Sequence, residues 1–411
     1  MQFRGKIFIT GILVAVLFAG GFIFTARAYG KKPGSRSWKA PVSLFESTER
    51  RKNLLPWAVH EHDGKIYAVF IQSRSRRKFH LLVHRSEDQG RTFKETANIQ
   101  LKNLSIPPAL LLKGKRLLGV YADRRRRLYF METNLDSGKS SDKVAIRLRG
   151  LYQADPFVWP VLKEIQGKLY YLCGKRARAR TYLRLFLLVS ENGGKKWRID
   201  SPRSWIQKRR RGGRPVIYAT RHVLHVMSRG TGEYGVNHYI KPLDGGKWVP
   251  TRDAFSRPNR KTVPLAAANN GKMTVVVYGS TKSYFTRSAL YGVRSKDGVM
   301  HWDERIQLAP RIHTDYANFT RIATGKSGFL LATTRPVERE SESGEDILLK
   351  IASPEGSDWR DAGLPGITSG NRGMPVAAFS KKGRKIYLLY RKYAPRSAKK
   401  FSMRILFRVR E

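Results

Sequence analysis

Seven apolar strand-like runs recur along the chain after residue 50, and each opens on a polar turn. Six of these turns carry a glycine, as at Gly64 and Gly114, whereas the fourth lacks it. The runs cover residues 63–70, 114–121, 167–172, 221–227, 271–278, 328–332 and 383–390. Short β-type runs between turns at even spacing predict an all-β chain.

Each run is the second strand of a repeat of about 50 residues. First strands are expected after a proline, or over residues 319–322 in the sixth repeat. These prolines are Pro56, Pro108, Pro156, Pro215, Pro264 and Pro375. A third strand and a turn into a fourth complete each repeat, which is the pattern of a β-propeller blade. The seventh repeat offers only three strands, so residues 42–45 are expected to add its fourth and close the ring.

The turn between the third and fourth strands carries the most specific pattern. In the first repeat it spans residues 86–93, with Ser86, Asp88, Gly90 and Phe93 at its key positions. Related turns occupy residues 190–197, 295–302 and 353–359, with a fragment at 244–248. The acidic side chain can accept backbone N–H groups, glycine supplies a positive φ, and the aromatic ring packs between strands.

These turns resemble the Asp-box, and with the repeat period the chain resembles the sialidase superfamily over residues 42–411. The resemblance implies a β-propeller, for which we predict seven four-stranded blades, with six as the alternative because sialidases have six. It also implies arginines that hold a sugar carboxylate, a tyrosine nucleophile with its glutamate, and an acid/base aspartate. On this resemblance, Arg229 and Arg287 correspond to the second and third arginines and Tyr316 to the nucleophile.

The chain departs from the sialidase pattern at several catalytic positions. Leu54 replaces the first arginine, residues 73–78 contain no carboxylate for the acid/base role, and Tyr218 occupies the place of the glutamate. Loss of a general acid typically removes about 10²–10⁴ in rate. The departures favour a binding or scaffold module over an enzyme, and an exo-sialidase or related hydrolase of acidic sugars stays the alternative.

The charge of the chain indicates which kind of ligand would bind and at which face. Lys and Arg number 80 against 31 Asp and Glu, for a net charge of +49. The basic runs fall in segments between second and third strands, which share a face with the loops leading into first strands, opposite the Asp-box turns. The candidate ligand-binding arginines are Arg74, Arg76, Arg124, Arg126, Arg214, Arg229, Arg287 and Arg372. A face of this kind would attract an anionic glycan or acidic protein, although colloidal solubility is a second explanation.

Other chemistries find little support in the sequence. Cys173 is the single cysteine and is expected to be a buried apolar side chain. The nine histidines show no metal-ligand spacing, so no metal or cofactor is expected. Nucleic acid is disfavoured because no recognised basic–aromatic module appears, and the oligomeric state is left open.

The N-terminus holds an apolar run over residues 7–24, 18 residues long, behind Arg4 and Lys6. It suits either a membrane span or a signal peptide, with residues 26–28 resembling a cleavage site. We expect residues 1–28 to be the signal or anchor, 29–41 a linker and 42–411 the propeller. The propeller is placed in the periplasm or outside the cell, membrane-anchored through 7–24, or secreted if cleaved after Ala28. The cations after the run argue against export, and that conflict stays open.

Overall fold

The computed structural model describes most of the chain beyond residue 36. The described residues are 37–49, 53–75, 78–102, 104, 108–125, 127–148, 160–176, 182–202, 205–208, 215–229, 236–251, 261–281, 288–299, 301–312, 320–338, 343–364, 371–394 and 402–411. Every regular element among them is a β-strand. Within these ranges no helix is long and apolar enough to cross a membrane.

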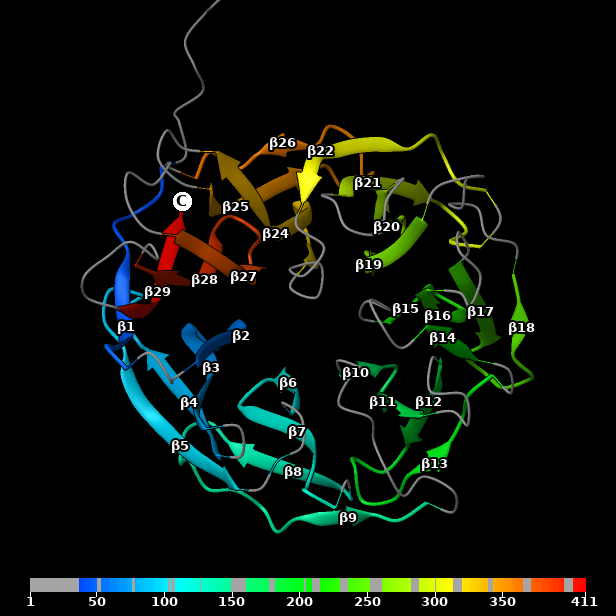
Figure 1. Ribbon diagram of the computed structural model, residues 1–411, viewed down its shortest axis with the longest axis horizontal. Coiled ribbons are helices and arrows are strands. Elements are labelled where there is room, and N and C mark those ends of the chain that lie inside the picture. The colour runs from blue at the N-terminus through cyan, green and yellow to red at the C-terminus, as the bar shows by residue number, and fades with distance from the viewer. Residues whose placement is uncertain are drawn as a thin grey trace, which may run out of the picture. The chain divides into compact units, whose positions relative to one another are not determined.

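The strands form seven antiparallel sheets, numbered here as blades one to seven (Figure 1). Blade one contains β2 (Asn53–His62), β3 (Lys65–Ser75), β4 (Lys78–Ser86) and β5 (Lys94–Lys102), and blade two contains β6 (Ala109–Lys113), β7 (Arg116–Ala122), β8 (Leu128–Asn134) and β9 (Val144–Ile146). Blade three contains β10 (Val161–Ile165), β11 (Lys168–Arg176), β12 (Tyr182–Ser190), β13 (Arg198–Ile199) and the extra strand β14 (Ile206–Lys208), which pairs with β12.

Blade four contains β15 (Val216–Ala219), β16 (Val223–Arg229), β17 (Val236–Pro242) and β18 (Val249–Pro250), and blade five contains β19 (Lys261–Asn269), β20 (Thr274–Thr281), β21 (Ser288–Ser295) and β22 (Ile306–Ile312). Blade six contains β23 (Arg321–Gly325), β24 (Gly328–Glu338), β25 (Ser343–Ala352) and β26 (Arg360–Asp361). Blade seven contains β27 (Asn371–Phe379), β28 (Ile386–Tyr393), β29 (Met403–Arg410) and, from the other end of the chain, β1 (Val42–Ser47).

The seven blades close into a ring. The first strands are innermost, and each contacts the first strands of both neighbouring blades, including β27 against β2 (Figure 1). The outer edge of β29 pairs with β1, from Val42 opposite Phe407 to Ser47 opposite Met403, with a shift of register between Ser43 and Phe45. The predicted seven blades and the closing strand are therefore confirmed.

The core lies between blades, because successive side chains of a strand point to opposite faces of its sheet. In β24, Phe329 and Leu331 pack against blade five, while Leu330 and Ala332 pack against blade seven. All four are at most 1% exposed. The second strands are near-continuous apolar runs because both faces of each blade are covered. Cys173 is buried in β11, as expected, and burial raises the pKa of its thiol to about 12.

Several first strands begin earlier than the sequence suggests. Residues Pro56, Pro264 and Pro375 lie inside β2, β19 and β27, and each coincides with a shift of strand register. Proline has no N–H for the ladder and is tolerated where a bulge interrupts pairing. In blade three the strand begins after Pro160, and Pro156 lies outside the described residues.

The turn after β4 is held by side-chain hydrogen bonds to its own backbone. The Ser86 hydroxyl donates to Asp88 at 2.7 Å and accepts the N–H of Gly90 at 2.8 Å. Asp88 also accepts the hydroxyl of Thr92 at 2.6 Å and its N–H at 2.9 Å. These bonds hold the pKa of Asp88 well below its usual range, and the bond from the Thr92 hydroxyl has the largest effect. Matching turns are built on Ser190, Asn192 and Gly194 and on Ser295, Asp297 and Gly298.

The glycines of these turns pack against the preceding blade. A Cβ added to Gly90 would lie 2.4 Å from Cε1 of Phe407 in blade seven, and one added to Gly194 would lie 2.4 Å from Phe130 in blade two. Both glycines have φ near +90°, at +89° and +96°. The turns therefore serve blade packing, on the face opposite the basic segments.

Candidate functional site

We call basic face the side of the ring formed by second-to-third strand connections and by the connections into first strands. Antiparallel order places these connections together, opposite the turns after the third strands. The turn after β7 presents exposed arginines on this face. Arg124 and Arg125 are exposed there, whereas Arg127 is held by Asp123, with Nε 2.8 Å from Oδ2.

The predicted site residues are only partly covered by the described structure. Arg124 is exposed, Arg229 ends β16, and Arg372 lies at the start of β27; the backbone of Arg74 lies in β3. The remaining candidates, Arg76, Arg126, Arg214, Arg287 and Tyr316, lie outside the described residues. The ligand-binding and catalytic roles of all nine stay predictions.

Arg372 is a buried member of an ion pair. Its Nε and Nη2 lie 2.7 and 2.6 Å from Oδ1 of Asp346 in β25. Arg372 is 2% exposed and Asp346 is 7% exposed. The same carboxylate oxygen accepts the N–H of Ile347 at 2.7 Å. This guanidinium therefore ties blade seven to blade six.

Neighbouring polar contacts extend this junction to blade one. Tyr393 donates its hydroxyl to Glu345 at 2.6 Å, and Asn371 accepts the N–H of Glu345 at 2.8 Å. Arg391 lies late in β28, a second strand, where basic segments were expected; it is buried and donates to Asn53 at 2.9 Å. Its guanidinium also lies 5.0 Å from the centre of the Tyr393 ring.

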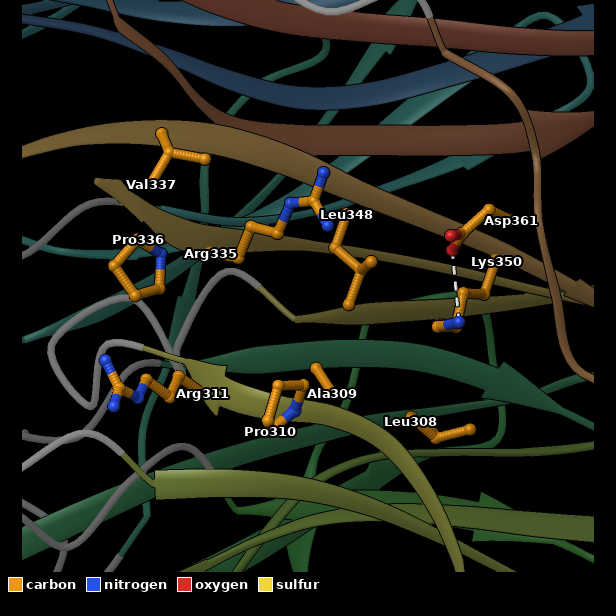
Figure 2. A pocket seen from close by; sticks show the side chains of 10 residues that line it. All are labelled: Leu308, Ala309, Pro310, Arg311, Arg335, Pro336, Val337, Leu348, Lys350 and Asp361. Atoms are coloured by element: carbon orange, nitrogen blue, oxygen red, sulfur yellow. Dashed lines mark ion pairs between the residues drawn. The ribbon is translucent and has the colours of Figure 1, made fainter. Parts of the chain in front are cut away.

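A cavity of about 510 Å³ lies between blades five and six. It is lined by Leu308, Ala309, Pro310 and Arg311 of β22, Arg335, Pro336 and Val337 of β24, Leu348 and Lys350 of β25, and Asp361 of β26. Figure 2 shows Arg311 and Arg335 toward one end and the Lys350–Asp361 ion pair, 3.0 Å long, at the other. We call it the blade five–six cavity.

The arginine end of this cavity belongs to the basic face, since Arg311 is near the end of β22 and Arg335 near the end of β24. Sequence reasoning missed both residues. The sequence could have indicated Arg335 by its position late in a second strand, because basic segments follow second strands in other repeats. Nothing in the sequence pairs that strand end with β22.

Blade four encloses a stack of three ionisable rings. His225 lies 3.1 Å from His238, Nδ1 to Nε2, and its ring stacks on Tyr218 with centroids 4.4 Å apart. Desolvation lowers the pKa of His225 to about 3 and of His238 to about 4, and raises the pKa of Tyr218 well above its usual range. Tyr218 donates to the carbonyl of Gly298 at 3.4 Å. It is thus a packing residue between blades four and five.

The described residues contain no group of three or more His, Cys, Asp or Glu side chains arranged to hold a metal ion. Three carboxylates described at the basic face, Asp123, Glu345 and Asp346, each have a partner in the protein. The face is therefore built from cations with few free acids among the described side chains.

Comparison with known proteins defines the class of fold. No model of a protein family matches the chain, and no curated protein matches its sequence. Among solved structures, an ulvan lyase of a new polysaccharide lyase family, bound to a saccharide of GlcA and Rha3S, is 8% identical with a TM-score of 0.53, covering 87% of this chain and 95% of that one.

Two other similar structures act on glycans by their names. The α-L-arabinanase of Penicillium chrysogenum is 13% identical with a TM-score of 0.46, covering 90% of this chain and 98% of that one. The sialidase of Trypanosoma rangeli is 13% identical with a TM-score of 0.45, covering 92% of this chain and 60% of that one. These neighbours are β-propellers, and at such identities the likeness concerns the fold alone. The chain is a seven-bladed β-propeller of this broad structural class.

Proposed function

We propose that this propeller is a binding or scaffold module that engages an anionic glycan through its basic face. The observation that carries the proposal is the difference between the arginines and the carboxylates of that face. Arg124 and Arg125 are exposed, while the carboxylates Asp123, Glu345 and Asp346 are each bonded to protein partners. Such a face attracts polyanions and offers arginine forks to carboxylate or sulfate groups.

The fold is compatible with this ligand class. The ulvan lyase of similar fold is bound to GlcA and Rha3S, which are anionic sugars. An acidic protein is the other partner that the charge admits. Glycoside cleavage is the alternative function, and it would require Tyr316 with Arg229 and Arg287 to act together.

A polymer-binding assay tests the proposal. We expect the protein to bind polygalacturonate or dextran sulfate and to leave neutral dextran unbound. The affinity should fall as salt is raised, because exposed charges are screened. The same samples should release no new reducing ends. Equal retention of neutral dextran, or cleavage of an acidic glycan that is lost in Tyr316→Phe, would contradict a binding role.

We further propose that residues 7–24 hold the propeller at a membrane, with the propeller exported. The support is the length and apolarity of the run. Fractionation of cells that express the full chain or a form lacking residues 1–28 tests this. We expect the full chain in the membrane fraction and the shortened form outside it. A full chain in the soluble fraction, at its uncleaved mass, would refute anchoring.

A further inference from the structure

The blade five–six cavity is large enough to hold a small ligand. Its volume of about 510 Å³ lies within the range of pockets that hold small molecules. Its lining includes the buried side chains of Leu308 and Leu348, together with Pro310 and Pro336. Such a surface can pack against the C–H groups on one face of a sugar ring.

The charge in this cavity is uneven. Three cations and one carboxylate line it, and the carboxylate, Asp361, is paired with Lys350 at 3.0 Å. No lining carboxylate lies at the other end, where Arg311 and Arg335 are (Figure 2). Nε of Arg335 is screened from solvent, and no hydrogen-bond partner for it exists in the described part of the protein. A desolvated guanidinium gains most from an added oxyanion, which it can bind in a forked geometry.

The walls also limit the shape of the ligand. Strand β22 is the outer edge of blade five, where a peptide strand could in principle add. Pro310 lies in this strand and cannot donate an N–H to an added strand. The cavity is therefore better suited to a compact ring with one anionic substituent than to an extended acidic peptide.

We propose that the blade five–six cavity binds a single sugar ring bearing a carboxylate or sulfate group, with the anion at Arg311 and Arg335 and the ring over Leu308 and Leu348. This inference rests on the proposed function, because it names where one anionic sugar of the glycan binds. The arginine end joins the cavity to the basic face, so a chain lying on that face could insert one unit here.

Small probes separate this site from the face as a whole. Methyl glucuronide carries a carboxylate and glucose 6-sulfate carries a sulfate, and methyl glucoside is the neutral control. Binding is followed by saturation-transfer NMR and by calorimetry at constant ionic strength. We expect at least one anionic probe to bind, with saturation on its ring protons, and the neutral probe to bind at least about tenfold more weakly. If neither anionic probe binds better than methyl glucoside, the inference is overturned.

Variants assign the binding to the cavity. Arg335→Gln should lower the affinity for the anionic probe by about tenfold, and Arg311→Gln should have the same effect. Because Arg311 is exposed, its replacement should leave the protein folded even if Arg335→Gln unfolds it. Lys272→Gln removes the same charge from an exposed turn on the opposite face and should leave probe affinity unchanged. Equal probe affinity in the wild type and both arginine variants would overturn the site.

The polymer assay distinguishes failure of the cavity proposal from failure of the proposed function. If polygalacturonate or dextran sulfate binds the wild type but both cavity variants retain full affinity for the small probes, the cavity proposal alone fails. If the wild type binds neither polymer nor probe, the proposed function fails and the cavity proposal fails with it.

Discussion

Arg372 and Asp346 form a buried ion pair that joins the innermost strand of blade seven to blade six, with two guanidinium nitrogens 2.7 and 2.6 Å from one carboxylate oxygen. Both residues lie near the basic face, where a free arginine would be a ligand-binding group. Their pairing instead holds blade seven against blade six. The cations of this face thus divide into those used by the fold and those open to a partner.

The first prediction concerns this ion pair. Asp346→Ala leaves Arg372 buried without its carboxylate, and we expect a loss of about 3–5 kcal/mol in the free energy of unfolding. Replacing both residues, as Asp346→Leu with Arg372→Met, should recover most of that loss. Urea unfolding of Asp346→Leu, Arg372→Met and the double variant measures the coupling between the two residues. A single-variant loss below about 1 kcal/mol would show that the pair is dispensable.

The second prediction tests how the turns dock onto neighbouring blades. Gly194→Ala places a Cβ 2.4 Å from the ring of Phe130 in a backbone with φ of +96°. Gly193 next to it has φ of +69° and open space around its Cβ position. We expect Gly193→Ala to cost about 1–2 kcal/mol from backbone strain alone, and Gly194→Ala to cost about 1–3 kcal/mol more from overpacking. Thermal unfolding of the two variants gives the comparison, and equal costs would argue against this docking.

The third prediction is a loss of stability in mild acid. Burial lowers the pKa of His225 to about 3 and of His238 to about 4, whereas both titrate near about 6.5 in the unfolded chain. Below about pH 6.5 the unfolded state therefore binds more protons, and the free energy of unfolding falls as the pH falls toward the folded pKa values. Each histidine contributes up to about 1.4 kcal/mol per pH unit in this window.

Urea unfolding between about pH 7 and about pH 5 measures this slope. The double variant His225→Gln with His238→Gln keeps polar side chains without titration and should lose most of the slope. His60 and His84, whose pKa values are also lowered by burial, account for the remainder. A double variant with the wild-type slope would contradict the assignment, whatever its stability at neutral pH.

The sequence predicts the repeat architecture well because the second strands are covered on both faces and read as apolar runs. The closing role of residues 42–45 follows from the missing fourth strand of the last repeat, and β1 confirms it. The bulges at Pro56, Pro264 and Pro375 were not predicted, because a proline alone does not tell where the ladder is interrupted.

The candidate site was harder to predict, because a cation's surroundings depend on other blades. Arg391 is buried through a partner, Asn53, that lies 338 residues away in the sequence. Arg335 lines a candidate site only because β24 packs beside β22 around the blade five–six cavity. Local basic runs identify the face, but they do not separate structural arginines from those available to a ligand.

The most direct test of the binding face compares matched charge reversals on the two sides of the ring. Arg124→Glu with Arg125→Glu alters the basic face, and Lys195→Glu with Lys196→Glu alters an exposed turn on the opposite face by the same charge. Polygalacturonate affinity is measured for both and for the wild type at several salt concentrations. We expect the basic-face variant to bind at least roughly tenfold more weakly, with a shallower salt dependence, and the other to stay within about twofold. Equal weakening in both variants would mean that net charge alone attracts the glycan, and would contradict a dedicated binding face.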